Sequence, residues 1–326
     1  MRFVPLALLL LVPVAAQAAK TLDIYFVDVE GGQATLVVAP SGQTLLIDAG
    51  YAGNSGRDAL RIAAAAKAAG VKRIDNLLIT HFHSDHVGGV KNLLEKLPVG
   101  AFLDKGISVE TKDYPAEYSA AFSKGQHKVV TPGETIPVKD LKVTVLAAAG
   151  KNLEGRGESN AFCAGTQPRV GEEEEGENPQ SAAVVIEFGK FRFLDPGDLP
   201  YNRELSLLCP QNLIGKIDLY LTSHHGAESP AAIAGMTPRV AIMNNGPRKG
   251  GEPEAWKRVH NVPGLEDLWQ LHFSIAGGKD ANTPDTMIAN VDEQCQGVYL
   301  KVAAAADGSF TVTNPRNKYS KTYGAK

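Results

Sequence analysis

The stretch "LLITHFHSDHVGG", residues 77–89, places three histidines and one aspartate close together at the end of an apolar run. His81, His83, Asp85 and His86 form the pattern H-x-H-x-D-H. Imidazole nitrogens and carboxylate oxygens are the usual protein ligands of zinc and related divalent metals. In a loop, alternate side chains can point to different sides, so the pattern predicts two adjacent metal ions, with His81 and His83 holding the first and Asp85 and His86 the second.

A second histidine cluster, "LTSHHGAESP", contains His224 and His225 and also follows an apolar run directly. The two clusters together hold five of the eight histidines in the chain, which disfavours a chance accumulation. One member of the pair is expected to complete the second metal site. The residues do not decide which one; we favour His225 as the ligand, which leaves His224 to contact substrate or act as a general acid.

Two aspartates at expected strand ends extend this site. Asp198, in "FRFLDPGDLP", lies between the histidine clusters, where a carboxylate can bridge two metals. Asp48, which ends "LLIDAG", is a candidate to orient a ligand imidazole from behind. A turn is the alternative for both positions, since Pro-Gly-Asp and strand ends often carry aspartate without a metal.

The local patterns around the motif alternate strands and helices. We expect strands over residues 22–29, 34–39, 44–48 and 76–80, and helices over residues 57–69 and 87–97. Farther along, strands are expected over residues 141–147, 183–188, 191–194, 217–222, 239–243, 298–303 and 309–313. Early strands, intervening helices and later hairpins favour two packed sheets with helices outside them.

Composition and the N-terminus constrain the class of protein. The formal net charge of −3 gives no sign of a nucleic-acid-coating or membrane-surface protein. Residues 1–18 have the features of a secretory signal peptide with cleavage after Ala18, and their apolar segment is shorter than the roughly 20 residues that a membrane span requires. We therefore expect residues 19–326 to form one domain in a secreted or periplasmic protein with no membrane span. Three cysteines allow at most one disulfide.

The H-x-H-x-D-H loop, the upstream "LLIDAG" and the later Gly-Asp resemble the metallo-β-lactamase fold superfamily over nearly the whole mature chain. Within it, "DIYFVDVEGGQATLVVAPSGQTLLIDAG", "NPQSAAVVIEFGKFRFLDPGD" and "SHHGAESP" are similar to the hydrolase domain of ComEC/Rec2-type competence proteins. The resemblance implies an α/β (α+β) fold, namely a four-layer αββα sandwich with the metal site at one edge of the sheets. It also implies a phosphodiesterase or nuclease type of activity.

The chain departs from the superfamily pattern at one ligand. Most members supply another metal-binding histidine before the Gly-Asp strand, whereas here no histidine occurs between His127 and His224. Asn178 and Ser181 stand in that region, as in the ComEC-like branch, and we expect them to donate hydrogen bonds to substrate oxygens, with loop capping as the alternative. Fewer nitrogen ligands favour a harder ion such as manganese, although zinc also suits the site. Nothing resembling the competence protein's membrane channel is present, so a role in DNA uptake is not implied.

These residues predict a dinuclear-metal hydrolase with zinc or manganese ions, in which Asp85 orients an activated water. Arg248 and Lys249, beside Gly-rich backbone in "MNNGPRKGGEP", are candidates to bind substrate phosphate, and Arg248 is taken as the site residue; a basic surface turn is the alternative. The expected substrate is a small-molecule or nucleotide phosphodiester, and no protein partner is predicted. The acidic run at residues 172–175 would disfavour a long polyanion if it overhangs the site.

Two other functions remain open. The same chemistry can hydrolyse a carboxylic ester, lactone or β-lactam, although the missing histidine and the His-His-Gly sequence disfavour it. A non-catalytic binding protein with a vestigial metal site is the second alternative, which the complete set of central ligand positions disfavours.

Overall fold

The computed structural model describes residues 20–108, 112–172 and 175–325. The expected signal peptide, residues 1–18, lies outside the described residues, as do Glu173 and Glu174 of the acidic run. Among the helices that the structure describes, none is long and apolar enough to cross a membrane.

The first of two large sheets has the strand order β20-β19-β18-β1-β2-β3-β4-β5-β6. Neighbouring strands are antiparallel from β20 to β3 and parallel from β3 to β6. Its strands are β1 (Leu22–Phe26), β2 (Thr35–Val38), β3 (Thr44–Ile47), β4 (Ile74–Ile79), β5 (Val99–Asp104), β6 (Gln126–Val129), β18 (Leu300–Ala304), β19 (Phe310–Asn314) and β20 (Tyr319–Tyr323).

The second sheet has the order β17-β16-β15-β14-β12-β11-β8-β7, with β9 paired to β8. The strands from β12 to β17 run parallel. Its strands are β7 (Thr135–Ile136), β8 (Lys142–Ala148), β9 (Lys151–Asn152), β11 (Ala183–Phe188), β12 (Phe191–Asp195), β14 (Leu219–Leu221), β15 (Val240–Met243), β16 (Asp267–His272) and β17 (Ile288–Asn290). A small separate sheet pairs β10 (Glu158–Ser159) with β13 (Gln211–Asn212).

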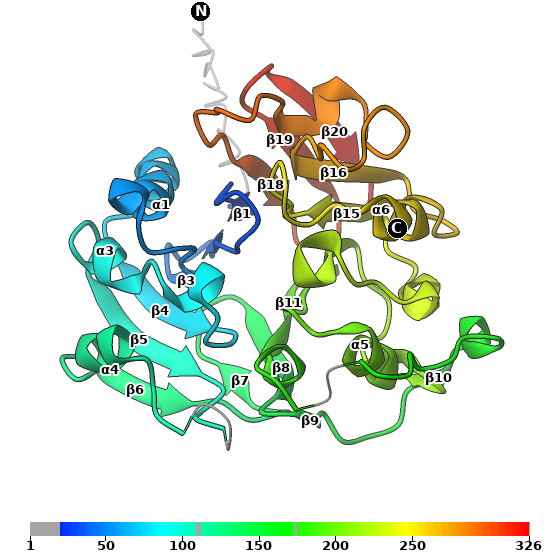
Figure 1. Ribbon diagram of the computed structural model, residues 1–326, viewed down its shortest axis with the longest axis horizontal. Coiled ribbons are helices and arrows are strands. Elements are labelled where there is room, and N and C mark those ends of the chain that lie inside the picture. Colours follow the sequence, from blue (N-terminus) through cyan, green and yellow to red (C-terminus); the bar gives the residue numbers. More distant parts are fainter. Residues whose placement is uncertain (1–19, 109–111, 173–174, 326) are drawn as a thin grey trace, which may run out of the picture.

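The two large sheets pack face to face, and helices cover both outer faces (Figure 1). The central core combines side chains from both sheets; for example, the rings of Phe26 and Phe193 meet edge to face at 5.5 Å. Residues along one strand alternate between layers, so Leu78 joins the central core while Leu77 and Ile79 face the outer helices. This arrangement is the αββα sandwich that the resemblance implied.

The outer layers are made by six α-helices and several single-turn 3-10 helices in the described chain. Helices α1 (Arg57–Ala68), α3 (Val90–Leu94) and α4 (Ala116–Phe122) cover the first sheet, and α5 (Tyr201–Leu208) and α6 (Pro253–His260) cover the second. Figure 1 shows these two groups on opposite sides of the molecule. The short α2 (Ser84–Val87) carries part of the H-x-H-x-D-H motif.

The single helix expected over residues 87–97 is wrong, because the chain breaks it at Gly88 and Gly89 into α2 and α3. A Cβ atom on Gly88 would lie 2.7 Å from the Ala52 backbone nitrogen, and one on Gly89 would lie 2.0 Å from the Ala49 oxygen. Both glycines therefore let the motif loop approach the residues that follow β3. Helix α1 is preceded by a 3-10 turn (Asn54–Gly56), whose last residue, Gly56, caps the helix.

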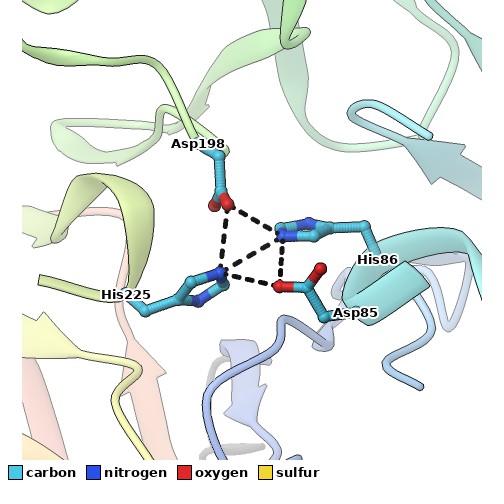
Figure 2. A group of neighbouring side chains, drawn as sticks. All are labelled: Asp85, His86, Asp198 and His225. Carbon is cyan, nitrogen blue, oxygen red and sulfur yellow. Dashed lines mark hydrogen bonds and ion pairs between the residues drawn. The ribbon is translucent and has the colours of Figure 1, made fainter. Parts of the chain in front are cut away.

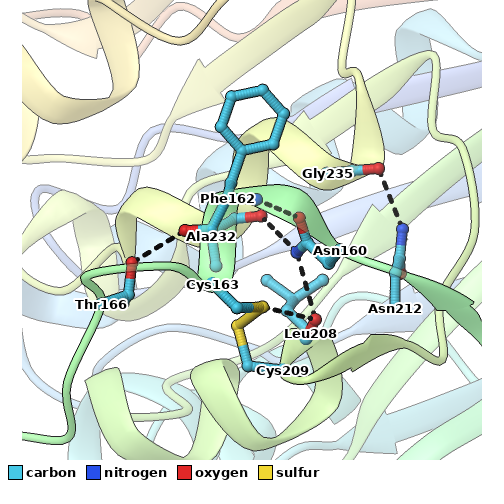
Figure 3. Close-up of a disulfide and its surroundings, with 9 residues drawn as sticks. All are labelled: Asn160, Phe162, Cys163, Thr166, Leu208, Cys209, Asn212, Ala232 and Gly235. Carbon is cyan, nitrogen blue, oxygen red and sulfur yellow. Dashed lines mark hydrogen bonds between the residues drawn. A yellow bond between two sulfur atoms is a disulfide. The ribbon is translucent and has the colours of Figure 1, made fainter.

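A disulfide joins Cys163 to Cys209, as the count of three cysteines allowed, while Cys295 stays a free thiol (Figure 3). Cys163 ends a 3-10 helix (Ala161–Cys163) and Cys209 directly follows α5. Beside the disulfide, the buried Asn160 amide donates hydrogen bonds to the carbonyl oxygens of Leu208 and Ala232, both at 3.1 Å. The bridge thus fastens the long β9 to β11 connection to the outer layer of the second sheet.

Candidate metal centre

Four strand ends converge at one edge of the sandwich. Asp48 follows β3, the H-x-H-x-D-H loop follows β4, Asp198 follows β12, and the 3-10 helix Ser223–Gly226 follows β14. Chain connections at strand ends are where functional side chains are held by rigid neighbours. The structure therefore brings the separated motifs of the sequence to one place.

Four of these side chains form a compact, buried cluster: Asp85, His86, Asp198 and His225 (Figure 2). One ligand atom from each lies within 4.8 Å of the ligand atoms of the others. His225 Nε2 is 3.2 Å from Asp85 Oδ2, and His86 Nε2 is 3.4 Å from the same oxygen. Two imidazoles and two carboxylates in such close contact are a ligand set typical of zinc and other first-row divalent ions.

Asp198 occupies the centre of the histidines. Its Oδ2 atom lies 3.0 Å from His225 Nε2, 3.1 Å from His86 Nε2, 3.8 Å from His81 Nε2 and 3.9 Å from His224 Nε2. Both expected metal positions therefore share access to the same carboxylate. Its turn requires Gly197, which has a φ of 58° and packs so that a Cβ would meet Thr80 and Ser181 at 3.1 to 3.3 Å.

Asp48 lies behind His86 rather than in the cluster. Its Oδ2 is 2.6 Å from His86 Nδ1, and its Oδ1 accepts a 2.7 Å hydrogen bond from the Thr80 backbone N–H. A carboxylate on Nδ1 fixes the imidazole tautomer that leaves Nε2 free toward Asp198. The structure thus places Asp48 against His86, and its expected effect on a metal-bound imidazole stays a prediction.

His81, His83 and His224 lie beside the compact cluster. His81 is fully buried, with Nε2 3.0 Å from Nδ1 of the less buried His83. His224 and His225 both have left-handed backbones, with φ values of 49° and 55°. This uncommon conformation turns the two neighbouring rings in different ways, so that His225 enters the cluster and His224 remains partly exposed at its rim.

The electrostatic environment favours ionised carboxylates. Burial would raise the pKa values of Asp85 and Asp198, but His225 and His86 more than offset this effect and lower both pKa values. Burial, aided by the nearby His86, lowers the pKa of His81 well below its ordinary range. For His86, burial is outweighed by Asp198 and Asp48, so its pKa is raised, and a cation bound there must displace a proton.

Buried polar atoms without a hydrogen-bond partner gather around this cluster in the described part of the chain. They include Asp198 Oδ1, Asn178 Oδ1, Ser181 Oγ and His224 Nδ1. Such atoms are costly in a protein interior unless an ion, water or ligand satisfies them. Together with the donor set, they show that the residues present fit divalent metal ions.

Asn178 and Ser181 are both buried at this edge. Asn178 begins a 3-10 helix (Asn178–Gln180), and the Ser181 Cβ atom lies against Gly197, directly beside Asp198. Glu177, which follows the acidic run of residues 172–175, accepts a 2.8 Å hydrogen bond from the Phe82 backbone N–H. Glu177 also pairs with the buried Lys105 at 3.2 Å, which anchors the motif loop.

Arg248 is not brought to the cluster. Its exposed side chain pairs with Glu293, whereas the next residue, Lys249, contacts Asp85. Gln33 was not a candidate from the sequence, yet its Nε2 lies 2.9 Å from an oxygen of the buried Asp195. A lone glutamine carries no ligand pattern, so only the folded chain reveals this contact.

A second group of possible ligands, Asp28, His272 and Cys295, lies elsewhere in the structure. The Arg61 guanidinium is 3.5 Å from Asp28 Oδ2 and 3.4 Å from Cys295 Sγ. Because this cation already neutralises the group, we treat it as an internal ion-pair network rather than a metal site.

Comparisons with known proteins agree with the geometry. The family model described as the metallo-β-lactamase superfamily matches residues 27–226. Over 183 residues the chain is 25% identical to ComE operon protein 3 of Bacillus subtilis (strain 168), covering 55% of this chain but only 21% of that protein.

Solved structures show likeness at low identity. The metallo-β-lactamase fold protein YhfI of Bacillus subtilis matches with a TM-score of 0.49 and 11% identity, covering 86% of this chain and 99% of that one. Tm1679, described as a metal-dependent hydrolase of the β-lactamase superfamily, matches with a TM-score of 0.46 and 15% identity, covering 76% of this chain and 95% of that one. The family match spans well over half of the chain and includes the strand ends that carry the cluster, so this chain belongs to the metallo-β-lactamase superfamily.

Proposed function

We propose that this protein is an exported, dinuclear-metal hydrolase that cleaves phosphodiester bonds. The observation that carries the proposal is the position of Asp198 Oδ2, which lies within 3.9 Å of four histidine nitrogens and can serve two metal positions. Divalent zinc or manganese ions bound there would lower the pKa of a bound water and neutralise charge on a phosphoryl oxygen.

The residues divide between the two positions. His81 and His83 would hold the first ion, Asp85, His86 and His225 the second, and Asp198 would contact both. Asp48 keeps His86 in the orientation that presents Nε2 to the cluster. Asp85, ionised because its pKa is lowered, would also accept a hydrogen bond from the attacking water and so orient it.

His224 is the best placed residue to handle the leaving group. It is partly exposed at the rim of the cluster, and burial lowers its pKa. Its ring would donate a hydrogen bond to a phosphoryl oxygen, or its protonated form would pass a proton to the departing oxygen.

Two features favour a phosphodiester over a carboxylic ester, lactone or β-lactam. The region that carries the usual additional histidine has Asn178 and Ser181, whose buried oxygens lack partners among the described residues and suit a harder ion. Lys249 adds a positive charge beside Asp85, which favours an anionic substrate. The resemblance of the sequence to the hydrolase domain of ComEC/Rec2-type competence proteins implies the same choice, and this chain spans about a fifth of ComE operon protein 3.

Export is part of the proposal. The sequence of residues 1–18 predicts a signal peptide, and the disulfide between Cys163 and Cys209 suits an oxidising compartment. A secreted or periplasmic enzyme would meet small phosphodiesters, nucleotides or released nucleic acid.

A parallel substrate assay tests the reaction class. Residues 19–326 would be reconstituted separately with manganese and zinc and given bis-p-nitrophenyl phosphate, nitrocefin and a simple lactone. We expect cleavage of the phosphodiester, with Asp198→Ala abolishing it. Cleavage of only nitrocefin or the lactone would establish the competing hydrolase function, and inactivity of metal-loaded protein on every substrate class would favour a vestigial site.

A further inference from the structure

Lys249 is held at the edge of the cluster by the tight packing of its backbone. In the Gly-rich turn of residues 246–251, Gly246 N–H donates to the Lys249 carbonyl oxygen at 2.8 Å, and Gly251 N–H donates to the His225 oxygen at 3.0 Å. A Cβ on Gly250 would lie 2.2 Å from that His225 oxygen, and one on Gly31 would lie 2.8 Å from the Lys249 Cβ. The turn therefore packs tightly between the β1 to β2 loop and the His224/His225 segment.

The Lys249 side chain reaches across the mouth of the cluster. Its ammonium contacts Asp85 Oδ2 and lies 3.3 Å from the Tyr51 hydroxyl. The side chain is 43% exposed, whereas Asp85 is 8% exposed, so the ammonium is the outermost of the two groups. A molecule that approaches Asp85 from solvent would meet Lys249 and Tyr51 first.

Once metal ions are bound, the net positive charge around Lys249 favours the binding of an anion. Two divalent cations add four positive charges and Lys249 a fifth, against the three carboxylates of Asp48, Asp85 and Asp198. When Asp85 also binds a metal ion, its ion pair with the Lys249 ammonium is weaker. An oxyanion of the substrate is the group that restores the balance, and lysine is a common phosphate ligand in proteins.

We infer that Lys249 and the Tyr51 hydroxyl bind a non-bridging phosphoryl oxygen of the substrate beside Asp85. The inference rests on the proposed phosphodiesterase function and assigns the phosphate contact to Lys249 instead of Arg248. The positive charge of Lys249 favours anionic phosphoesters over neutral esters. The Tyr51 hydroxyl accepts a hydrogen bond from the Lys249 ammonium and so holds it in position.

Direct binding of inorganic phosphate tests this site without turnover. Isothermal titration calorimetry would compare the manganese-reconstituted wild type with Lys249→Met, Lys249→Arg and Tyr51→Phe, and the metal content of every sample would be measured. Loss of a hydrogen bond to a charged group predicts a rise in the phosphate Kd of roughly 10- to 100-fold for Lys249→Met. Lys249→Arg should recover part of the affinity, Tyr51→Phe should cost less than Lys249→Met, and metal content should not change.

Lys257→Met is the matched control, because Lys257 is also about half exposed and paired with a glutamate, but lies on α6. It should bind phosphate as the wild type does. Unchanged phosphate affinity in Lys249→Met, or a loss explained by lost metal, would overturn the inference and leave Lys249 as a positioning residue for Asp85. An effect of Arg248→Met in its place would also overturn it.

Failure of the inference and failure of the proposed function have different signatures. If only the inference fails, the wild type still cleaves bis-p-nitrophenyl phosphate and Lys249→Met does so with an unchanged KM. If the function itself is wrong, the wild type with full metal content does not cleave that substrate.

Discussion

Asp48 Oδ2 lies 2.6 Å from Nδ1 of His86, and both side chains are fully buried. This pair links the strand end after β3 to the motif loop after β4. We therefore expect Asp48 to influence metal affinity through His86, although it lies behind the expected metal position.

Asp48→Ala should therefore weaken metal binding by roughly 10- to 100-fold, the usual effect of removing the partner of a ligand histidine. Competition with a chromophoric chelator would measure the affinity. Asp104→Ala is the control, since Asp104 is equally buried and lies 2.7 Å from Nε2 of His127, away from the cluster. Equal metal affinity in the wild type and Asp48→Ala would contradict the assigned role.

The two adjacent histidines should separate metal binding from chemistry. His225→Ala should lose bound metal, because its Nε2 contacts both Asp85 and Asp198. His224→Ala should keep its metal content while kcat falls by about 10²- to 10⁴-fold, as expected for loss of a general acid. Metal analysis beside steady-state kinetics would check this division, and loss of metal in His224→Ala alone would reverse the two roles.

How far the sequence predicted the fold depends on whether the signal was local. Strands with strong apolar patterns, such as residues 44–48 and 183–188, are confirmed as β3 and β11 within a residue or two. The break at Gly88 and Gly89 was missed because the need for glycine comes from Ala49, which is distant in sequence. Strands such as β5 and β16 were not predicted, and their pairing depends on neighbours across the sheet.

The candidate site shows the same contrast between local sequence signals and contacts that form only in the fold. The motif spacing identified the histidines and Asp198 as candidates, and the structure brings them together. Sequence could not distinguish Arg248 from Lys249, because neighbouring residues in a turn point in directions that only the packing against Gly31 and His225 determines. Whether each assigned residue performs its role stays a prediction.

A buried carboxyl outside the centre should make stability depend on pH. Burial raises the pKa of Glu204 to about 8, and the Tyr220 hydroxyl donates a hydrogen bond to it that offsets part of that rise. The pKa of a glutamate in the unfolded chain is about 4.3, so the folded state favours the protonated form. The free energy of unfolding is therefore highest below about pH 4.3 and falls as the pH rises toward 8.

Glu204→Gln should remove this dependence. With metal-free protein, the free energy of unfolding of the wild type should fall relative to the variant by up to about 1.4 kcal/mol per pH unit between pH 5 and 8. Urea unfolding at several pH values would measure it. Parallel profiles for the two proteins would show that Glu204 ionises normally in the folded state.

The disulfide should contribute substantially to stability. Cys163 and Cys209 are 46 residues apart, and the chain-entropy model gives about 4 kcal/mol for a loop of that length. Cys163→Ser and the double variant with Cys209→Ser should lose the same free energy of unfolding, since either change removes the single cross-link. Unequal losses would mean that the side chains matter apart from the bond.

Metal titration of phosphodiester cleavage tests the central claim most directly. Metal-free residues 19–326 would be titrated with manganese while cleavage of bis-p-nitrophenyl phosphate and bound metal per chain are followed, with Asp198→Ala in parallel. The account predicts no cleavage without metal, activity that rises to a plateau near two ions per chain, and none in the variant. Full activity in the metal-free protein, or in metal-treated Asp198→Ala, would contradict it.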